Sequence, residues 1–403
     1  MSLASITAAP KHAAYDVVIV GGAIMGSSTA WWLSTDPAFQ GRVLVVEKDP
    51  DYREASSALS ASCIRHQFSN AVNVKLSMFG TEFVKNFREW LGGDPEIPEI
   101  TLKEFGYMLL ASEAGVPILK ANQAVQADCG AATRLMTPDQ IKAQFPFYHV
   151  DGVAMGSFNP VGEGWFDGAT MMQWWRRKAR ENGVDYVRGE VVAMDRRGGR
   201  VENVTLASGE TVACGTVVNA AGPYGGKTAA MASIHHPVEP RKRCLFVFSC
   251  REELGQSLPL TVDPSGVHCR SEGDLYLTGT APEDDSPPAH DDFEVVYSEF
   301  EDEIWPVVAN RVPAFEAIKL ANAWVGHYDY NALDQNAVIG PHPEVGNFHF
   351  VNGFSGHGLQ QAAGAGRGVC ELIVHGGFRT LDLSELAYDR IAAGRPFLEQ
   401  AII

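Results

Sequence analysis

The first fifty residues alternate between apolar runs and a segment of helix-forming residues. Residues 16–20 are rich in β-branched side chains, residues 24–33 combine large apolar side chains with helix formers, and residues 43–46 form a second apolar run. Short continuous apolar runs are typical of strands that are buried on both faces. The pattern therefore predicts a β-α-β unit near the start of the chain.

Helical spacing predicts two further helices. In residues 70–91 the large apolar side chains recur at helical spacing until Gly92 and Gly93 end the pattern, and residues 169–182 repeat this arrangement. Between these segments, residues 94–150 divide into strand-like pieces separated by prolines. We expect short strands there.

The second half of the chain is richer in strand patterns. Strands are predicted at 185–194 and 201–206, and residues 235–330 contain several more short strands. Within that segment lie a proline-rich acidic loop at 281–292 and a helical pattern near 292–309. Residues 235–330 therefore fit a separate, largely antiparallel lobe.

The turn between the first strand and the first helix resembles a dinucleotide-binding fingerprint. In G-x-G-x-x-G the glycines permit a tight turn, close approach to a pyrophosphate and helix packing. Gly21, Ala23 and Gly26 occupy these positions, so the second glycine is replaced. Glu47 ends the next strand 21 residues after Gly26, where a carboxylate can accept hydrogen bonds from ribose hydroxyls.

Two later strands also end in glycine-rich turns. The apolar run at 217–222 enters such a turn, and residues 348–358 combine a strand, a glycine-rich turn and the start of a helix. A helix start directs backbone N–H groups and a positive dipole end at an anion. Three such segments suit one extended flavin bound by a discontinuous domain, whereas an NAD enzyme would not need the later two.

Composition changes the picture mainly by exclusion. The 403 residues include 32 basic and 49 acidic side chains, a net charge of −17 that argues against a nucleic-acid partner. No apolar stretch reaches the roughly 18 residues of a transmembrane helix. Residues 1–14 match neither a secretory signal nor a transit peptide, so we expect a flexible tail and a cytoplasmic protein.

Local charge and cysteine patterns indicate little chemistry. The acidic segment 283–303 reads as a solvated surface, with a partner-docking patch as the alternative, and the basic run at 241–243 also reads as solvated. The seven cysteines include no C-x-x-C pair, so neither a disulfide framework nor a metal site is predicted. The pattern leaves the oligomeric state open.

Together these segments resemble the D-amino-acid-oxidase (DAO) family of flavoenzymes, which includes glycine, sarcosine and dimethylglycine oxidising enzymes, over nearly the whole chain. The motifs that carry the resemblance are residues 18–26 (VIVGGAIMG), 56–57 (SS), 64–69 (IRHQFS), 218–223 (VNAAGP) and 353–358 (GFSGHG). Residues 163–167, 238–243, 328–331 and 334–336 further resemble the branch of FAD-dependent oxidoreductase domain-containing proteins. That branch is linked to respiratory-complex assembly rather than to a defined substrate.

The resemblance implies an α/β fold with two lobes. A discontinuous, Rossmann-like FAD-binding domain would comprise residues 15–92, 151–234 and 331–390. A second domain, built on a largely antiparallel β-sheet and binding the substrate, would comprise residues 93–150 and 235–330, and residues 391–403 would form a C-terminal tail.

The resemblance also assigns residues to FAD. Gly21, Gly26 and Glu47 would hold the ADP half, and the helix start at 356–358 would face the pyrimidine end, where positive potential stabilises reduced flavin. The full set expected at the cofactor is Gly21, Gly22, Ala23, Ile24, Met25, Gly26, Glu47, Lys48, Ser56, Ser57, Arg65, His66, Val192, Ala221, Gly222, Gly353, Gly356, His357, Gly358, Leu359 and Gln360.

Two positions depart from the monomeric sarcosine oxidases of this family. Those enzymes bond the flavin through a cysteine shortly before the position of Asp334, where this chain has residues 327–330 (HYDY). They also carry a substrate-binding lysine two residues after the Gly-His-Gly turn, where this chain has Gln360. We therefore expect a noncovalent flavin and a different cation for the substrate carboxylate.

Flavin-dependent amine oxidation requires a free nitrogen lone pair, the α C–H held near flavin N5 and a cation for the carboxylate. Arg65 is the first candidate for flavin or carboxylate contact, with a surface ion pair as the alternative. Arg270 lies in the strand pair expected to cover the flavin, and a substrate role competes there with an ordinary solvated arginine.

Other side chains have two interpretations each. His268 and His327 can orient the amine, although a structural role is the commoner one for a single histidine. Tyr330, together with Tyr328, can form a pocket wall or pack in the core. Cys63 lies near the expected flavin, where it can bond the cofactor or be buried as a small apolar residue.

The sequence thus predicts an FAD-dependent oxidation of a secondary amino acid such as iminodiacetate or sarcosine. A hydride would pass from the carbon next to nitrogen to flavin N5, and water would split the imine into an amine and an aldehyde of the glyoxylate type, with reoxidation by oxygen. A dicarboxylate is slightly favoured because Arg65 and Arg270 offer two cations. The alternatives are a dehydrogenase that uses a carrier protein or quinone, and a non-catalytic assembly flavoprotein.

Overall fold

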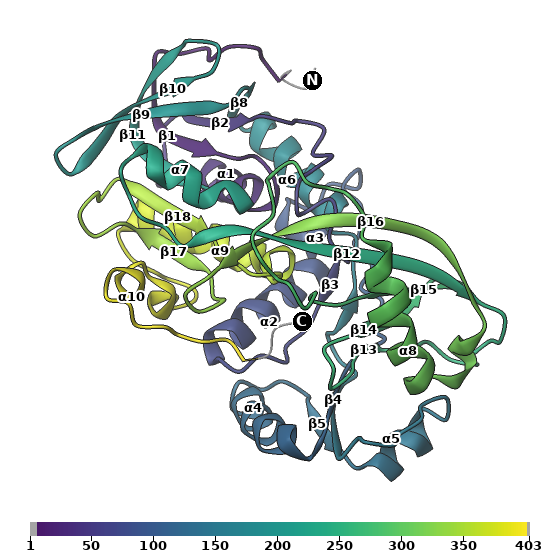
Figure 1. Cartoon of the computed structure of the whole chain (residues 1–403). Coiled ribbons are helices and arrows are strands. Elements are labelled where there is room, and N and C mark those ends of the chain that lie inside the picture. Colours follow the sequence, from purple (N-terminus) through teal and green to yellow (C-terminus); the bar gives the residue numbers. More distant parts are fainter. Residues whose placement is uncertain (1–5, 401–403) are drawn as a thin grey trace.

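The computed structural model describes residues 6–400, which form two lobes that each contain a large sheet (Figure 1). The first sheet has the path β17 (Val338–Pro341), β18 (Phe348–Asn352), β11 (Thr211–Asn219), β1 (Ala14–Val20), β2 (Val43–Glu47) and β8 (Asp185–Arg188), with β10 (Arg200–Leu206) and β9 (Val191–Arg197) attached to β11. Its central pairs β18–β11, β11–β1, β1–β2 and β2–β8 are parallel, and this arrangement confirms the predicted α/β fold with a Rossmann-like domain.

Residues 17–20 of strand β1 are all apolar because both faces of the sheet are covered there. Val17 and Ile19 pack into the core on one face of the sheet, with α1 (Ile24–Thr35), α2 (Ala71–Lys85), α6 (Gly168–Glu181) and α9 (Gly358–His375). Val18 and Val20 pack on the other face with residues of α7 (Gly225–Met231), β9 and β10. Successive side chains of a strand point to opposite faces, so a doubly covered strand reads as one apolar run.

The second lobe is built on a mostly antiparallel sheet. Its strand order is β16 (Ile318–Asn331), β12 (Val238–Cys250), β15 (Leu275–Gly279), β14 (His268–Glu272), β13 (Leu260–Val262), β4 (Tyr107–Ala111), β6 (Met155–Asn159) and β5 (Arg134–Met136). A π-helical turn (Glu299–Ile304) and α8 (Trp305–Arg311) cover one face through Phe300, Ile304 and Val308, which pack against Phe246 and other core residues. Strand β6 belongs to this sheet, although the sequence pattern placed residues from 151 onward in the other domain.

Residues 94–150 contain the predicted short strands, β4 and β5, but also two helices. The prediction of strand-like pieces was wrong for these two helical segments. These helices are α4 (Val116–Asp128) and α5 (Pro138–Gln144). Pro117 and Pro138 stand in the first turn of each helix, where the missing N–H has no intrahelical partner anyway. The prolines therefore start helices here rather than separating strands.

The remaining elements are short. A small sheet pairs β3 (Cys63–Ile64) with β7 (Gly164–Trp165), and the short helices are α3 (Phe87–Trp90) and α10 (Asp389–Ala392).

The expected tail at 1–14 is described from residue 6, and Thr7 bridges to Val187 at the edge of the first sheet. No helix within residues 6–400 is long and apolar enough to cross a membrane. The cytoplasmic location stays a prediction.

Candidate active site

The carboxyl ends of β1 and β11 meet at the start of α1, where the backbone leaves no room for side chains. Gly21 has a φ of +96°, and a Cβ at this residue would lie 2.5 Å from the carbonyl oxygen of Ala220. A Cβ at Gly26 would lie 1.9 Å from the carbonyl oxygen of Gly21. The turn therefore packs as the fingerprint requires, with Ala23 as the N-cap of α1.

A carboxylate stands beside this turn at the end of β2. The Glu47 side chain accepts hydrogen bonds from the backbone N–H groups of Gly22 (2.7 Å) and Asp49 (2.8 Å). Burial raises the pKa of Glu47, and these two hydrogen bonds oppose that rise. The first turn of α1 carries no acidic side chain, and Ala23 offers no capping oxygen. The positive end of the helix dipole is thus left for an anionic ligand.

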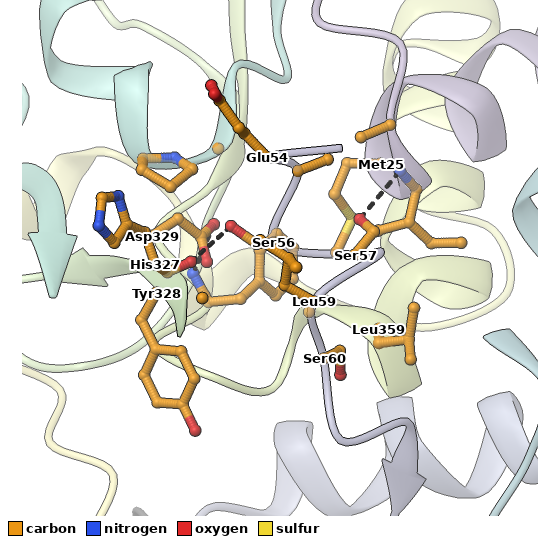
Figure 2. A pocket seen from close by; sticks show the side chains of 18 of the residues that line it. Met25, Glu54, Ser56, Ser57, Leu59, Ser60, His327, Tyr328, Asp329 and Leu359 are labelled. Carbon is orange, nitrogen blue, oxygen red and sulfur yellow. Dashed lines mark hydrogen bonds between the residues drawn. The ribbon is translucent and has the colours of Figure 1, made fainter. Parts of the chain in front are cut away.

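The loop after β2 connects the two lobes (Figure 2). Ser57 accepts a hydrogen bond at Oγ from the backbone N–H of Ile24, 3.3 Å away, and the Ser56 hydroxyl donates to the carbonyl oxygen of His327 in β16. Figure 2 shows these two contacts on opposite sides of the loop, one toward α1 and the other toward β16. The loop therefore aligns the start of α1 with the second sheet.

A second helix start, that of α9, faces the same region. Its N-cap is His357, which is 4% exposed and packs edge-on against the Phe68 ring, with ring centroids 5.0 Å apart. Burial, with the nearby Arg65 charge, places the pKa of His357 well below its usual value, so the ring is neutral. Its Nε2 has no hydrogen-bond partner among the described residues.

A cavity of about 390 Å³ runs between these features. One end is lined by Gly21, Glu47, Lys48 and Tyr224, and the other by Tyr107, Arg243, His268 and Tyr328. Its volume lies within the range of about 300–1,000 Å³ that is usual for small-molecule sites. It thus extends from the Rossmann-like turn to the face of the second sheet.

Arg65 is the cation that lies at the α9 end of the cavity. Its side chain is 2% exposed, its backbone N–H donates to Gln360 Oε1 (2.8 Å), and its Nη1 donates to the carbonyl oxygen of Gln67. Burial lowers the pKa of Arg65, against the charges of Tyr107, Glu399 and Glu163. Gln360, which stands where sarcosine oxidases have lysine, therefore positions the backbone of Arg65.

A buried carboxylate lies behind the loop that carries Arg65. Glu163 is 0% exposed and accepts hydrogen bonds from the backbone N–H of His66 (2.6 Å) and the side chains of Gln67 (3.0 Å) and Asn159 (2.9 Å). Burial raises the pKa of Glu163 to about 7 despite these hydrogen bonds and the Arg65 charge. This group holds the Arg65 loop against β6 and β7.

The comparison with protein families identifies this arrangement. Residues 16–372 match the model of the DAO family, described as FAD dependent oxidoreductase. The chain belongs to this family.

Individual relatives agree with this membership. The chain is 41% identical to FAD-dependent oxidoreductase domain-containing protein 1 of Xenopus laevis, over 96% of this chain and 85% of the relative. It is 25% identical to human mitochondrial dimethylglycine dehydrogenase, over 90% of this chain and 42% of that protein. Among solved structures, L-proline dehydrogenase from P. horikoshii superposes with a TM-score of 0.82 at 25% identity, covering 95% of this chain and 99% of the other.

The protein is therefore an FAD-dependent oxidoreductase, and the residues present fit that cofactor. The turn at Gly21 and Gly26 has no room for a Cβ, so its backbone can form a cradle for the pyrophosphate. Glu47 stands at the expected ribose position. At the other end, His357 Nε2 and His268 Nδ1 are buried without partners among the described residues. The FAD predicted from the sequence is confirmed by the family.

Most of the predicted cofactor residues line the cavity of this DAO-family protein. Those that do are Gly21, Ala23, Ile24, Met25, Glu47, Lys48, Ser56, Ser57, Arg65, Ala221, Gly222, Gly356, His357, Gly358, Leu359 and Gln360. The candidate substrate residues His268 and His327 also line it. Cys63 lines it as a half-buried residue, and burial raises the pKa of its thiol.

Five predicted cofactor residues do not line the cavity. Gly22 and Gly353 lie within the turns that shape it, and Gly26 lies in the first turn of α1. His66 instead contacts Thr81 Oγ1 through Nε2 (2.8 Å). Val192 is 46% exposed, whereas its buried neighbour Val191 lines the cavity. Neighbouring residues of a strand face opposite sides of the sheet. The prediction was therefore displaced by one residue, from Val191, which faces the cavity, to Val192, which faces away from it.

Two predicted substrate residues do not line the cavity and have structural partners instead. Arg270 is 2% exposed, pairs with Glu272 (2.5 Å) and donates to the carbonyl oxygen of Ala61 (2.8 Å). Tyr330 lies two residues after Tyr328 on strand β16, and its hydroxyl accepts a hydrogen bond from the Gln335 side chain. Neither side chain is among those that line the cavity.

Sequence reasoning missed two residues that line the substrate end, Tyr107 and Arg243. Tyr107 begins β4, whose five apolar residues read as an ordinary core strand. Arg243 belongs to the basic run that was interpreted as solvated, yet it is 7% exposed. The available signal was strand periodicity, because Arg241 and Arg243 must share a face that is opposite to that of Lys242.

Proposed function

We propose that this FAD-dependent oxidoreductase oxidises a secondary, N-substituted amino acid at the carbon next to nitrogen. The observation that carries the proposal is the buried Arg65 guanidinium, which lines the cavity beside the start of α9. A buried cation of this kind can bind a substrate carboxylate through two parallel hydrogen bonds. FAD, when bound, supplies the acceptor for the two electrons that leave the substrate.

The remaining side chains at this end position the substrate rather than remove a proton. Burial, with the charges of Arg270 and Arg243, lowers the pKa of His268 to about 4, so its ring is neutral at pH 7. A neutral imidazole can accept a hydrogen bond from the substrate N–H and leave the nitrogen lone pair free. Tyr107 and Tyr328 add rigid walls, and burial raises the pKa of both phenols, which therefore remain protonated.

The proposed reaction balances without a further group on the protein. The C–H bond next to nitrogen breaks, two electrons and one proton leave as the equivalent of a hydride, and the nitrogen lone pair forms the C=N bond with loss of the N–H proton. Water then adds to the imine and releases a primary amine and an aldehyde of the glyoxylate type. Oxygen takes up the electrons in our proposal, with a carrier protein or quinone as the alternative acceptor.

The cavity also separates this proposal from a non-catalytic assembly role. A structural flavin needs no buried cations at its reactive end, whereas Arg65 and Arg243 both line that end. A cation at that end can bind a substrate carboxylate. The cationic lining therefore supports the catalytic proposal.

The experiment is anaerobic reduction of the bound flavin, followed as bleaching near 450 nm. We would test glycine, sarcosine, dimethylglycine, iminodiacetate, D-alanine and proline. Bleaching by an N-substituted glycine is expected. The rate constant of reduction divided by the substrate dissociation constant should be about 100-fold lower in Arg65→Gln, since a lost charged hydrogen-bond pair costs about 3 kcal/mol. The exposed Arg197→Gln serves as the control.

Two outcomes would change the proposal. If dithionite bleaches the flavin while no amine does, the oxidation of amino acids is excluded for this panel and the assembly role gains weight. If an amine bleaches it but air reoxidises the reduced protein only slowly in stopped flow, the protein is a dehydrogenase rather than an oxidase.

A further inference from the structure

The substrate end of the cavity contains a second guanidinium, that of Arg243 in β12. Arg243 and Tyr328 lie on neighbouring strands, and the Arg243 Cζ is 5.0 Å from the centroid of the Tyr328 ring. Both side chains line the cavity, as Arg65 does. Tyr328 also lies in the electrostatic field of both guanidinium groups. The cavity thus presents two cations near one tyrosine.

Arg243 is held by a carboxylate that reaches it from the surface. Its Nη1 and Nη2 donate to the two oxygens of Asp285, at 2.5 and 3.0 Å. The Arg243 side chain is 8% exposed, whereas that of Asp285 is 30% exposed. The Arg243 Nε is buried and has no hydrogen-bond partner among the described residues. The guanidinium is therefore fixed, and it keeps one donor for another group.

The loop that carries Asp285 is attached at its far end. Asp292 pairs with Lys242 (2.8 Å), His290 lies within hydrogen-bonding distance of the carbonyl oxygen of Pro223, and Phe293 stacks on His327 with centroids 4.4 Å apart. His290 and Phe293 line the cavity. Around Asp285 itself, the carboxylate contacts are with Arg243 and, at 3.7 Å, Arg241. A local movement of the turn at Asp285 can release Arg243 while the far end of the loop stays in place.

We propose that Arg243 forms a second carboxylate subsite, which Asp285 occupies in the free protein and a second carboxylate of the substrate occupies in the complex. This inference rests on the proposed function and narrows its substrate class to N-substituted amino acids with two acidic groups. Arg65 would bind one carboxylate and Arg243 the other, with the nitrogen between them near His268. The second cation predicted from the sequence was Arg270, and the structure offers Arg243 instead.

The exchange is physically balanced because one carboxylate replaces another. Removing Asp285 without replacement would leave a buried guanidinium unpaired, which is costly. A substrate with one carboxylate has no second acidic group to replace Asp285. It must therefore bind with Asp285 still paired to Arg243, or its binding free energy is reduced by the cost of an unpaired Arg243. A subsite at Arg243 therefore favours dicarboxylic substrates over monocarboxylic ones of similar length.

The test measures binding of two unreactive ethers to the FAD-loaded protein by titration calorimetry. Diglycolate has the shape of iminodiacetate and methoxyacetate that of sarcosine, but oxygen replaces the oxidisable amine in both. Diglycolate should bind at least 10-fold more tightly to the wild-type protein. In Arg243→Gln this preference should fall to about twofold or less, while methoxyacetate affinity stays within about twofold.

Three variants complete the design. Asp285→Asn removes the internal competitor and should tighten diglycolate binding severalfold, whereas a structural role for the pair would weaken it or leave it unchanged. Arg197→Gln, whose exposed side chain lies on β9 in the other lobe, is the control and should keep the wild-type preference. Arg243→Lys keeps the charge but loses the bidentate geometry, and it should retain part of the preference if Arg243→Gln does not bind flavin.

Each result bears on the subsite separately from amine oxidation. An unchanged preference for diglycolate in Arg243→Gln, or a loss of its binding in Asp285→Asn, overturns the subsite even if sarcosine bleaches the flavin. A preference that depends on Arg243 supports the subsite even if none of the amines bleaches the flavin, and in that case only the proposed reaction fails.

Discussion

At the scale of single residues, the most restrictive position of the site is Gly26. A Cβ there would lie 1.9 Å from the carbonyl oxygen of Gly21, which is a backbone atom and cannot rotate away. Gly26→Ala should therefore move α1 relative to β1 and lower the free energy of unfolding by about 1–3 kcal/mol. We expect most of the bound flavin to be lost, measured as the ratio of absorbance at 450 and 280 nm. Gly346→Ala is the control, because a Cβ at Gly346 meets no atom within 4 Å.

Glu163 gives the protein a specific pH dependence. Its folded pKa of about 7 lies above its usual value of 4.5, because burial disfavours the carboxylate. The folded state thus binds the proton more tightly than the unfolded state, and this contribution to stability is present below pH 4.5 and is lost as the pH rises through 7. The loss is roughly 3 kcal/mol.

The Glu163→Gln variant isolates this effect. Glutamine cannot ionise, so the free energy of unfolding of the variant should change less between pH 5 and pH 8 than that of the wild type, measured by urea denaturation. Glu104→Gln, whose pKa is lowered instead, should leave the wild-type slope in this range intact. Parallel slopes for Glu163→Gln and the wild type would show that Glu163 is ionised throughout.

At the scale of elements, the segment after α10 is attached to α2 through a buried carboxylate. Glu399 is 2% exposed and accepts hydrogen bonds from the backbone N–H (2.7 Å) and hydroxyl (2.6 Å) of Ser69 and from the Asn73 side chain (2.9 Å). A negative charge at the start of a helix is also favoured by the helix dipole. The part of the predicted tail that the structure describes is therefore packed against the protein.

We expect Glu399→Gln to lower the free energy of unfolding by about 1–3 kcal/mol, because charged hydrogen bonds are replaced by weaker ones and one amide N–H group faces donors. Limited proteolysis should cut the chain after α10 faster in this variant. The exposed Glu385→Gln, in the same region, should behave as the wild type in both assays. Equal cleavage of Glu399→Gln and wild type would contradict the role of this contact.

Elements also show what the sequence could and could not predict. The turn at Gly21, the strand that ends at Glu47 and the helix after Gly356 are local patterns, so their types could be read directly from neighbouring residues. Arg243 could not be placed in the cavity, because its burial depends on Asp285, which lies 42 positions away in the chain. The helix that contains Pro117 was not predicted for a local reason. A proline can end one element or begin a helix, and the residue alone does not say which.

At the scale of the whole molecule, the cavity is assembled from segments that are far apart in the chain. Its lining residues come from β1, β2, the turn after β11, the start of α9 and strands β16, β12, β14, β13 and β4 of the second sheet. A ligand that binds across these segments stabilises the folded state by mass action. FAD should therefore raise the melting temperature of the apoprotein, and it should do so in proportion to the logarithm of its concentration.

The same assembly predicts a noncovalent flavin. Cys63 is the cysteine nearest to Arg65, and burial raises the pKa of its thiol, so the nucleophilic thiolate is scarce. Cys244 also lines the cavity, and burial raises its thiol pKa to about 11. Acid precipitation of the holoprotein should therefore release the flavin into the supernatant, and Cys63→Ala should bind FAD like the wild type. A yellow, fluorescent pellet that turns colourless only in Cys63→Ala would instead show that this thiol bonds the cofactor.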